Sequence, residues 1–209
     1  MGVHSTFAGA VSGASDASIE AMAIGASTGG PQALFDLFDN IGSALEVPVF
    51  VTQHLPASFT PVLVERLGRI AQCPCVEARD GEVVAPGRIY FAPGERHMLI
   101  EGGRKAAVIR LSDAPRENYC RPAIDPMFRS AARTYGSALL AIVLSGMGED
   151  GLAGAREVAA HGGSVIVQDE ASSTVWEMPG AVADAGLASA VLSLAHIRHG
   201  ILGAAAHPP

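Results

Sequence analysis

The 209-residue sequence predicts one α/β domain with a three-layer, doubly wound Rossmann-like fold on a mostly parallel sheet. Short apolar runs rich in β-branched residues alternate with segments of helical spacing, as in successive βαβ units. Between residues 86 and 111, glycines and prolines break this rhythm into short runs, which predicts an antiparallel hairpin at one edge of the sheet. A hydrophobic fraction of 49% and a charged fraction of 17% are typical of a globular chain.

The expected elements have recognisable starts and faces. Leu34, Leu37 and Phe38 share one face of the first expected helix. Asp125-Pro126 is a typical helix start, with a capping side chain followed by a first-turn proline. The most apolar run, residues 138–144, is expected to be a central strand. In chain order we expect strand 22–24, helix 31–38, strand 47–52, helix 58–70, the runs 88–92, 97–101 and 106–111 as hairpin strands, helix 125–132, strand 138–144, helix 151–160, strand 164–167, a helix beginning near Pro179, strand 188–192 and a last helix from Ser193.

The chain is expected to form a single unit. Residues 1–19 are rich in Ala, Gly and Ser without a hydrophobic period, so we expect a flexible N-terminal lead-in there. Residues 20–203 are expected to be one domain, because they contain neither an internal repeat nor a linker.

Composition excludes several classes of function. Fourteen basic against 21 acidic residues give a net charge of −7, and aromatic residues make up only 5%, which argues against nucleic-acid binding. No signal peptide or membrane-spanning run is found, so we expect a cytoplasmic protein without membrane insertion. Cys73, Cys75 and Cys120 fit neither a disulfide scaffold nor a zinc site and are interpreted as packing residues. No metal or cofactor is expected.

The sharpest motif is Gly25-Ala26-Ser27-Thr28-Gly29-Gly30, between the first expected strand and helix. Gly-x-Ser-x-Gly is the nucleophile-elbow pattern, in which small residues flank a serine on a sharp turn that exposes its hydroxyl. The chain has 24 glycines, so this spacing alone is a weak signal, and its position before a helix carries the argument. A phosphate-binding loop is the alternative, but such motifs require glycine at Ser27 or lysine at Pro31.

A serine nucleophile requires a base and an orienting acid. His54 is the candidate base among seven histidines, since it directly follows the second expected strand, although alone it would be interpreted as structural. Asp150 lies in a glycine-rich loop after the central strand, where an aspartate commonly caps the next helix. Because parallel strands end at one edge of a sheet, Ser27, His54 and Asp150 are expected to converge there. The sequence therefore predicts a triad with Ser27 as nucleophile, His54 as base and Asp150 as orienting acid.

Longer motifs surround these residues and extend through most of the chain. They are Thr52-Gln53-His54-Leu55-Pro56 with Phe59, Tyr90-Phe91-Ala92-Pro93-Gly94 with His97-Met98, Arg121-Pro122-Ala123-Ile124-Asp125, Ser145-Gly146-Met147-Gly148-Glu149-Asp150-Gly151, and Glu170-Ala171-Ser172 with Met178-Pro179. With the serine turn, they make residues 21–195 resemble the catalytic domain of CheB-type chemotaxis methylesterases.

The resemblance implies a serine hydrolase that removes methyl esters from glutamyl side chains on the cytoplasmic helices of bacterial chemoreceptors, with water as co-substrate. Members of the family also often deamidate receptor glutamines. By resemblance, Ser27, His54 and Asp150 occupy the triad positions. Thr28 and Met147 fall where the family places residues of the oxyanion or substrate site.

The sequence departs from the family pattern in three places, of which the mildest is Leu55, where members usually have Met. Members usually carry an N-terminal receiver domain, and only about 20 residues precede the first expected strand, so no receiver domain is expected. Asn118-Tyr119-Cys120 replaces a segment that is usually more basic. The alternative to an enzyme is a receptor- or kinase-binding module that has kept this fold and lost catalysis.

Overall fold

The computed structural model describes residues 18–205 and contains a seven-stranded sheet in the order β3-β4-β2-β1-β7-β8-β9. All neighbouring strands in this sheet are parallel, which confirms the predicted fold class. The first strand, β1, lies between β2 and β7, so the chain winds away from it in both directions. The strands are β1 (Ala21–Ala26), β2 (Val49–Gln53), β3 (Cys75–Glu77), β4 (Ile89–Phe91), β7 (Leu139–Val143), β8 (Ser164–Gln168) and β9 (Ala190–Leu192).

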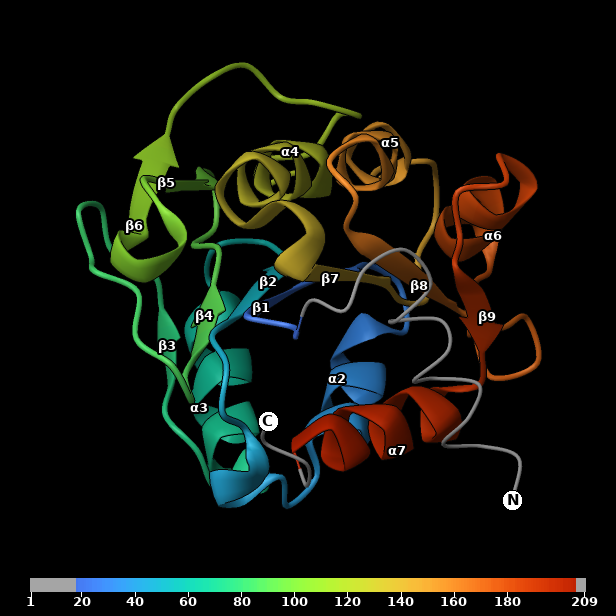
Figure 1. Cartoon of the computed structure of the whole chain (residues 1–209), viewed down its shortest axis with the longest axis horizontal. Helices are drawn as coiled ribbons and strands as arrows, with labels where there is room; N and C mark the ends of the chain where they lie inside the picture. The colour runs from blue at the N-terminus through green and yellow to red at the C-terminus, as the bar shows by residue number, and fades with distance from the viewer. Residues whose placement is uncertain (1–17, 206–209) are drawn as a thin grey trace.

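Helices cover both faces of the sheet (Figure 1). In β1, Met22 and Ile24 belong to one buried cluster, whereas Ala21 and Ala23 belong to another on the opposite face. This alternation follows from the two-residue period of a strand and gives the domain its three layers. One face carries α2 (Gly30–Phe38), α3 (Thr60–Ala71) and α7 (Leu194–Ala205), the other α4 (Ile124–Tyr135), α5 (Leu152–Ala160) and α6 (Glu177–Asp184), and the short 3-10 turns are Gly42–Ala44, Arg104–Ala106 and Gly136–Ala138.

The predicted hairpin is present as a small sheet of its own. Strand β5 (His97–Glu101) pairs antiparallel with β6 (Val108–Ser112). The Ser130 hydroxyl on α4 accepts a hydrogen bond of 3.0 Å from the Ile100 N–H, and the Thr134 hydroxyl donates one of 3.0 Å to the Ile100 carbonyl. The hairpin therefore packs on α4, beyond the β3–β4 end of the main sheet (Figure 1).

Two short strands in the middle of the chain differ from expectation. Residues 88–92 were expected to form a hairpin strand, but β4 pairs parallel with both β2 and β3. Its residues are almost fully buried, so β4 is an interior strand, and its flanking glycines and prolines mark loops leading into a parallel pair. The sequence does not predict strand β3, because its three residues show no apolar run, and in the structure they are only half-buried.

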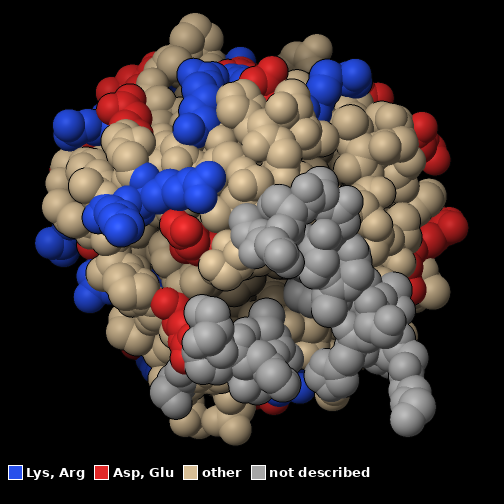
Figure 2. All heavy atoms as spheres, viewed as in Figure 1, with Lys and Arg blue, Asp and Glu red and all other residues tan. Residues whose placement is uncertain are grey.

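Three further observations concern the N-terminus, the length of the helices and the charge on the surface. Residues 1–17 of the predicted lead-in lie outside the described part of the chain. Within residues 18–205, no helix is long and apolar enough to cross a membrane. On the face seen in Figure 2, basic side chains lie beside acidic ones and do not form a continuous basic surface.

Candidate active site

The three predicted triad residues follow three neighbouring strands. Ser27 comes after β1, His54 after β2, and Asp150 lies in the loop after β7. Strands β1 and β2 end with Ala26 opposite Gln53, which makes Ser27 and His54 the next pair in register. The His54 N–H donates a hydrogen bond of 3.0 Å to the Ala26 carbonyl. The carboxyl edge of the sheet therefore brings these loops together where the strand order reverses, as the sequence predicted.

Glycines allow the sharp turn that carries Ser27. A Cβ atom at Gly25 would lie 2.6 Å from Cγ2 of Ile124, the first residue of α4. Gly29 has φ +82°, and a Cβ there would lie 2.5 Å from the Thr174 hydroxyl. A larger residue at either position would push neighbouring loops away, so the glycines have a packing reason that the motif alone does not reveal.

The loop after β7 packs directly against the serine turn. The Ser145 hydroxyl donates a hydrogen bond of 2.7 Å to the Thr28 carbonyl and ties the two loops together. A Cβ atom at Gly146 would lie 2.8 Å from Cβ of Ser27 and 2.2 Å from Sδ of Met178. Gly146 therefore packs directly against the Ser27 side chain, and the space between Ser27 and Met178 has no room for a larger residue at this position.

His54 and Asp150 are in contact through a hydrogen bond of 2.8 Å between Nε2 and Oδ2. The Asp150 side chain is 2% exposed and that of His54 is 13% exposed. Asp150 also accepts hydrogen bonds from the backbone N–H groups of Ile124 (2.7 Å) and Asp125 (3.1 Å) and from the Asn118 amide (3.0 Å). The carboxylate thus caps the N-terminus of α4, and not that of α5 as the sequence alternative suggested.

Asp125 and Asp150 cap each other's helices, and we call them the carboxylate pair. Asp125 Oδ1 accepts the N–H groups of Gly151 (3.0 Å) and Gly154 (2.6 Å) at the start of α5. The Asn118 amide bridges the pair, with its second bond of 2.9 Å to Asp125. The sequence prediction that Asp125 caps its own helix is wrong, because α4 begins one residue earlier and its N-cap makes no side-chain bond.

Burial and neighbouring charges shift the proton affinities of these groups. Burial lowers the pKa of His54, but hydrogen bonds to Asp150 and Cys120 and their charges outweigh it and raise the pKa to about 9. Burial opposes ionisation of Asp150, yet hydrogen bonds from His54 and the Ile124 N–H hold the pKa of this carboxyl below its usual range. Burial, and then the charge of Asp150, raise the pKa of Asp125. At neutral pH, His54 and Asp150 therefore form an imidazolium–carboxylate pair.

The remaining ring nitrogen of His54 faces a residue that the sequence did not single out. Its Nδ1 lies 3.6 Å from Cys120 Sγ. Within residues 18–205, the Ser27 hydroxyl makes no hydrogen bond. The sequence predicts a packing role for Cys120 and does not indicate Asn118 as a site residue. Both lie in the segment where the sequence departs from the family pattern, which is the signal that could have indicated them.

A metal ion fits this cluster poorly. The possible ligand atoms of His54, Cys120 and Asp150 lie within 4.8 Å of one another. The Asp150 oxygens already accept four hydrogen bonds, so only the His54 nitrogen and the Cys120 sulfur are available. Zinc sites in proteins use three or four protein ligands.

Thr28 and Met147 lie in the loops on either side of the serine. Thr28 follows Ser27 and is exposed, and the Met147 side chain is 67% exposed. Among the residues that the structure describes, neither backbone N–H donates a hydrogen bond. Both donors are therefore free of protein partners in the described part of the chain, next to the predicted nucleophile.

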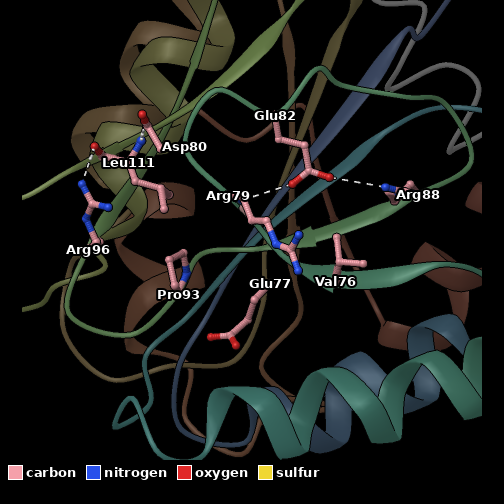
Figure 3. A pocket seen from close by; sticks show the side chains of 10 residues that line it. Val76, Glu77, Arg79, Asp80, Glu82, Arg88, Pro93, Arg96 and Leu111 are labelled. Atoms are coloured by element: carbon pink, nitrogen blue, oxygen red, sulfur yellow. Dashed lines mark hydrogen bonds and ion pairs between the residues drawn. The ribbon is translucent and has the colours of Figure 1, made fainter.

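A cavity of about 770 Å³ lies elsewhere, at the β3–β4 end of the sheet (Figure 3). Its charged lining is largely paired within the protein. Glu82 contacts Arg88 at 3.3 Å, and Arg96 donates a hydrogen bond of 3.0 Å to the Leu111 carbonyl. None of the predicted site residues lines it, so this cavity is separate from the predicted triad.

Comparison with known proteins identifies the family. Residues 22–201 match the family described as CheB methylesterase. The chain belongs to the CheB methylesterase family. It is 51% identical over 186 residues to a protein-glutamate methylesterase/protein-glutamine glutaminase of Paramagnetospirillum magneticum, covering 88% of this chain and 49% of that protein. A relative of the same name from Azospirillum brasilense is 52% identical over 179 residues, covering 85% and 45%.

Among solved structures, the CheB methylesterase catalytic domain of Thermotoga maritima superposes with a TM-score of 0.85 at 36% identity. The match covers 89% of this chain and 98% of that one. This confirms the family resemblance and the fold derived from the sequence. The chain spans about half the length of the curated relatives it matches.

Proposed function

We propose that this CheB family member is a serine hydrolase that removes methyl esters from glutamyl side chains of bacterial chemoreceptors. The names of the relatives above describe protein-glutamate methylesterases, and the solved structure that the chain matches is a CheB methylesterase catalytic domain. The observation that carries the proposal is the hydrogen bond between His54 and Asp150 at the edge of the sheet where Ser27 emerges.

In the proposed reaction, Ser27 Oγ attacks the ester carbonyl while His54 takes its proton. Asp150 holds the Nε2–H of the ring, so Nδ1 is the nitrogen that must accept this proton, and the serine side chain turns toward it. His54 then protonates the departing methanol, and water releases the glutamate from the acyl-enzyme. The free N–H groups of Thr28 and Met147 are the proposed donors to the oxyanion.

Glutamine deamidation is a second activity that the same residues can support. The relatives' names include protein-glutamine glutaminase. Attack of Ser27 on an amide carbonyl yields the same acyl-enzyme, with ammonia leaving in place of methanol. Release of ammonia from unmodified receptor measures this activity separately from release of methanol.

We also propose where the reaction takes place and which substrates and groups it needs. Residues 20–203 act as one catalytic unit, in the cytoplasm, with a receptor helix and water as substrates. The protein residues supply the nucleophile, base and acid, so the chemistry needs no metal or cofactor.

Methanol release from methylated chemoreceptor tests the esterase activity directly. Ser27→Ala should reduce the rate by at least about 1,000-fold, because the nucleophile is lost. Ser137→Ala is the matched control, since Ser137 lies in the 3-10 turn before β7, at the opposite edge of the sheet, and its variant should retain full activity. Retained activity in Ser27→Ala would contradict the role of Ser27.

A fluorophosphonate probe separates the enzyme from a binding module of the same fold, which the comparisons do not favour. The probe reacts with activated serines, so it should label the wild type and leave Ser27→Ala unlabelled. A wild-type protein that binds receptor but is not labelled would support the binding module instead.

A further inference from the structure

Cys120 is held in position by a tight turn. Glu117 and Cys120 exchange backbone hydrogen bonds of 3.1 and 2.8 Å, and both residues between them have positive φ, 48° at Asn118 and 63° at Tyr119. These angles define a two-residue turn of type I′. Asn118 anchors the turn through its hydrogen bonds to the carboxylate pair. The turn therefore presents Cys120 to the His54 ring in a fixed place.

The contacts of Cys120 form a relay like that of the proposed triad. Its sulfur lies 3.6 Å from His54 Nδ1, and His54 Nε2 bonds to the buried Asp150. A thiol next to an imidazole can transfer its proton to the ring, and an acid on the far side stabilises the resulting imidazolium. Cys120 is half-buried, beside the 96% exposed Tyr119, so a small molecule can approach it from solvent.

The other two cysteines provide a contrast within the same chain. Cys75 is the first residue of β3 and Cys73 lies two residues before it. Burial raises the pKa of both thiols, and the pKa of Cys75 reaches about 12 because the charge of Cys73 adds to the effect of burial. A thiol that stays protonated is a poor nucleophile, so these two cysteines are internal references for thiols that are not activated.

We propose that Cys120 is an oxidation site for hydroperoxides, and that it uses the same base, His54, as the proposed serine nucleophile. The step starts from the neutral form of His54, whose free Nδ1 accepts the proton of Cys120, and the Cys120 sulfur then attacks the terminal oxygen of the hydroperoxide. The S–O bond forms as the O–O bond breaks, and the departing oxide takes a proton from His54 and leaves as water or an alcohol. The sulfur loses two electrons and becomes a sulfenic acid, while the peroxide is reduced.

Oxidation at this place has a direct consequence for the esterase, and this part rests on the proposed function. The new oxygen is bonded to a sulfur that lies 3.6 Å from Nδ1, the nitrogen that must accept the Ser27 proton. A sulfenic acid there occupies the approach to the base and donates its own hydrogen bond to it. Hydroperoxide therefore switches the esterase off, and a thiol reductant restores it by reducing the sulfenic acid.

The first experiment measures the chemistry on sulfur without reference to esterase activity. The 209-residue protein is exposed to a low dose of hydrogen peroxide, trapped with dimedone, and the adducts on the three cysteines are quantified by mass spectrometry. Cys120 should be labelled about tenfold faster than Cys73 or Cys75, or more. Equal labelling of the three cysteines overturns the proposal.

Variants then test whether His54 is responsible. His54→Gln should slow Cys120 labelling about tenfold or more, because the proton acceptor is lost. Ser27→Ala should not slow it, since the serine takes no part. Folding of His54→Gln is checked by circular dichroism. If that variant is unfolded, the labelling rate of wild-type Cys120 against pH replaces it, and a profile parallel to those of Cys73 and Cys75 overturns the proposal.

Methanol release supplies the second readout, with each protein compared to its own untreated rate. Peroxide should remove most of the wild-type activity, with recovery in dithiothreitol, and Cys120→Ser should lose little of its own activity. Equal loss in Cys120→Ser overturns the proposed switch. A wild-type protein that releases no methanol but is selectively labelled at Cys120 would support the Cys120 chemistry and contradict the esterase assignment. Failure of the oxidation proposal can therefore be told apart from failure of the proposed function.

Discussion

Raising the pH from 7 to beyond 9 should increase kcat/KM for methyl ester hydrolysis about 100-fold, because His54 must be neutral to accept the serine proton. The His54 pKa of about 9 leaves only about 1% of the ring neutral at pH 7 and about 10% at pH 8. The logarithm of kcat/KM should therefore rise with a slope of one up to about pH 9 and then level off.

The assay is methanol release at low receptor concentration between pH 6 and 10, corrected with Ser27→Ala for direct hydrolysis by hydroxide. Cys120→Ala should move the midpoint below 9, because the contact with Cys120 raises the His54 pKa. Cys75→Ala is the matched control and should leave it in place. A rate that is level from pH 6 to 8, or a midpoint near 6.5 in the wild type, would refute the assignment of His54 as the base in this hydrogen-bonded state.

Three further perturbations follow from contacts around the site. Gly146→Ala should destabilise the fold by about 1–3 kcal/mol in urea titrations and lower methanol release, because its Cβ would overlap Met178 and press on Ser27. Asn118→Gly keeps the positive φ but removes the amide from the carboxylate pair, so the free energy of unfolding should fall by about 2 kcal/mol, and an unchanged value would contradict a bridging role. His54 binds its proton more tightly in the folded than in the unfolded chain, so its contribution to the free energy of unfolding should be complete below pH 6.5 and disappear between pH 6.5 and about 9. Urea titrations across this range should show this loss of stability in the wild type and not in His54→Gln.

Much of the fold could be predicted because local pattern and tertiary environment agree in it. The run 138–144 is apolar throughout and becomes β7, a strand covered on both faces. Strands β3 and β4 have three residues each, too few for a periodicity to emerge. Their pairing depends on neighbours distant in the chain, which local reasoning does not contain.

The residues of the candidate site that directly follow a strand could be predicted from the sequence. Ser27 and His54 follow directly from the rule that ligands bind at the carboxyl edge of an open sheet. Asp125 shows where such reasoning fails, because its local sequence indicates a cap for its own helix, yet the carboxylate reaches α5. Asn118 contacts Asp150 from 32 residues away in the chain, and Cys120 contacts His54 from 66 residues away, so only the folded chain reveals that their turn belongs to the site.

The exchange of caps between α4 and α5 makes the proposed acid a structural tie as well. Asp150 serves α4, Asp125 serves α5, and each lies at the head of the helix that the other supports. Replacing either aspartate with a neutral residue removes a negatively charged cap from one helix. It also changes the electrostatic potential at the other aspartate. A substitution of Asp150 that removes its proposed catalytic role therefore also disturbs the contact between α4 and α5. A related protein that keeps the fold but has lost catalysis should carry compensating substitutions at the starts of both helices.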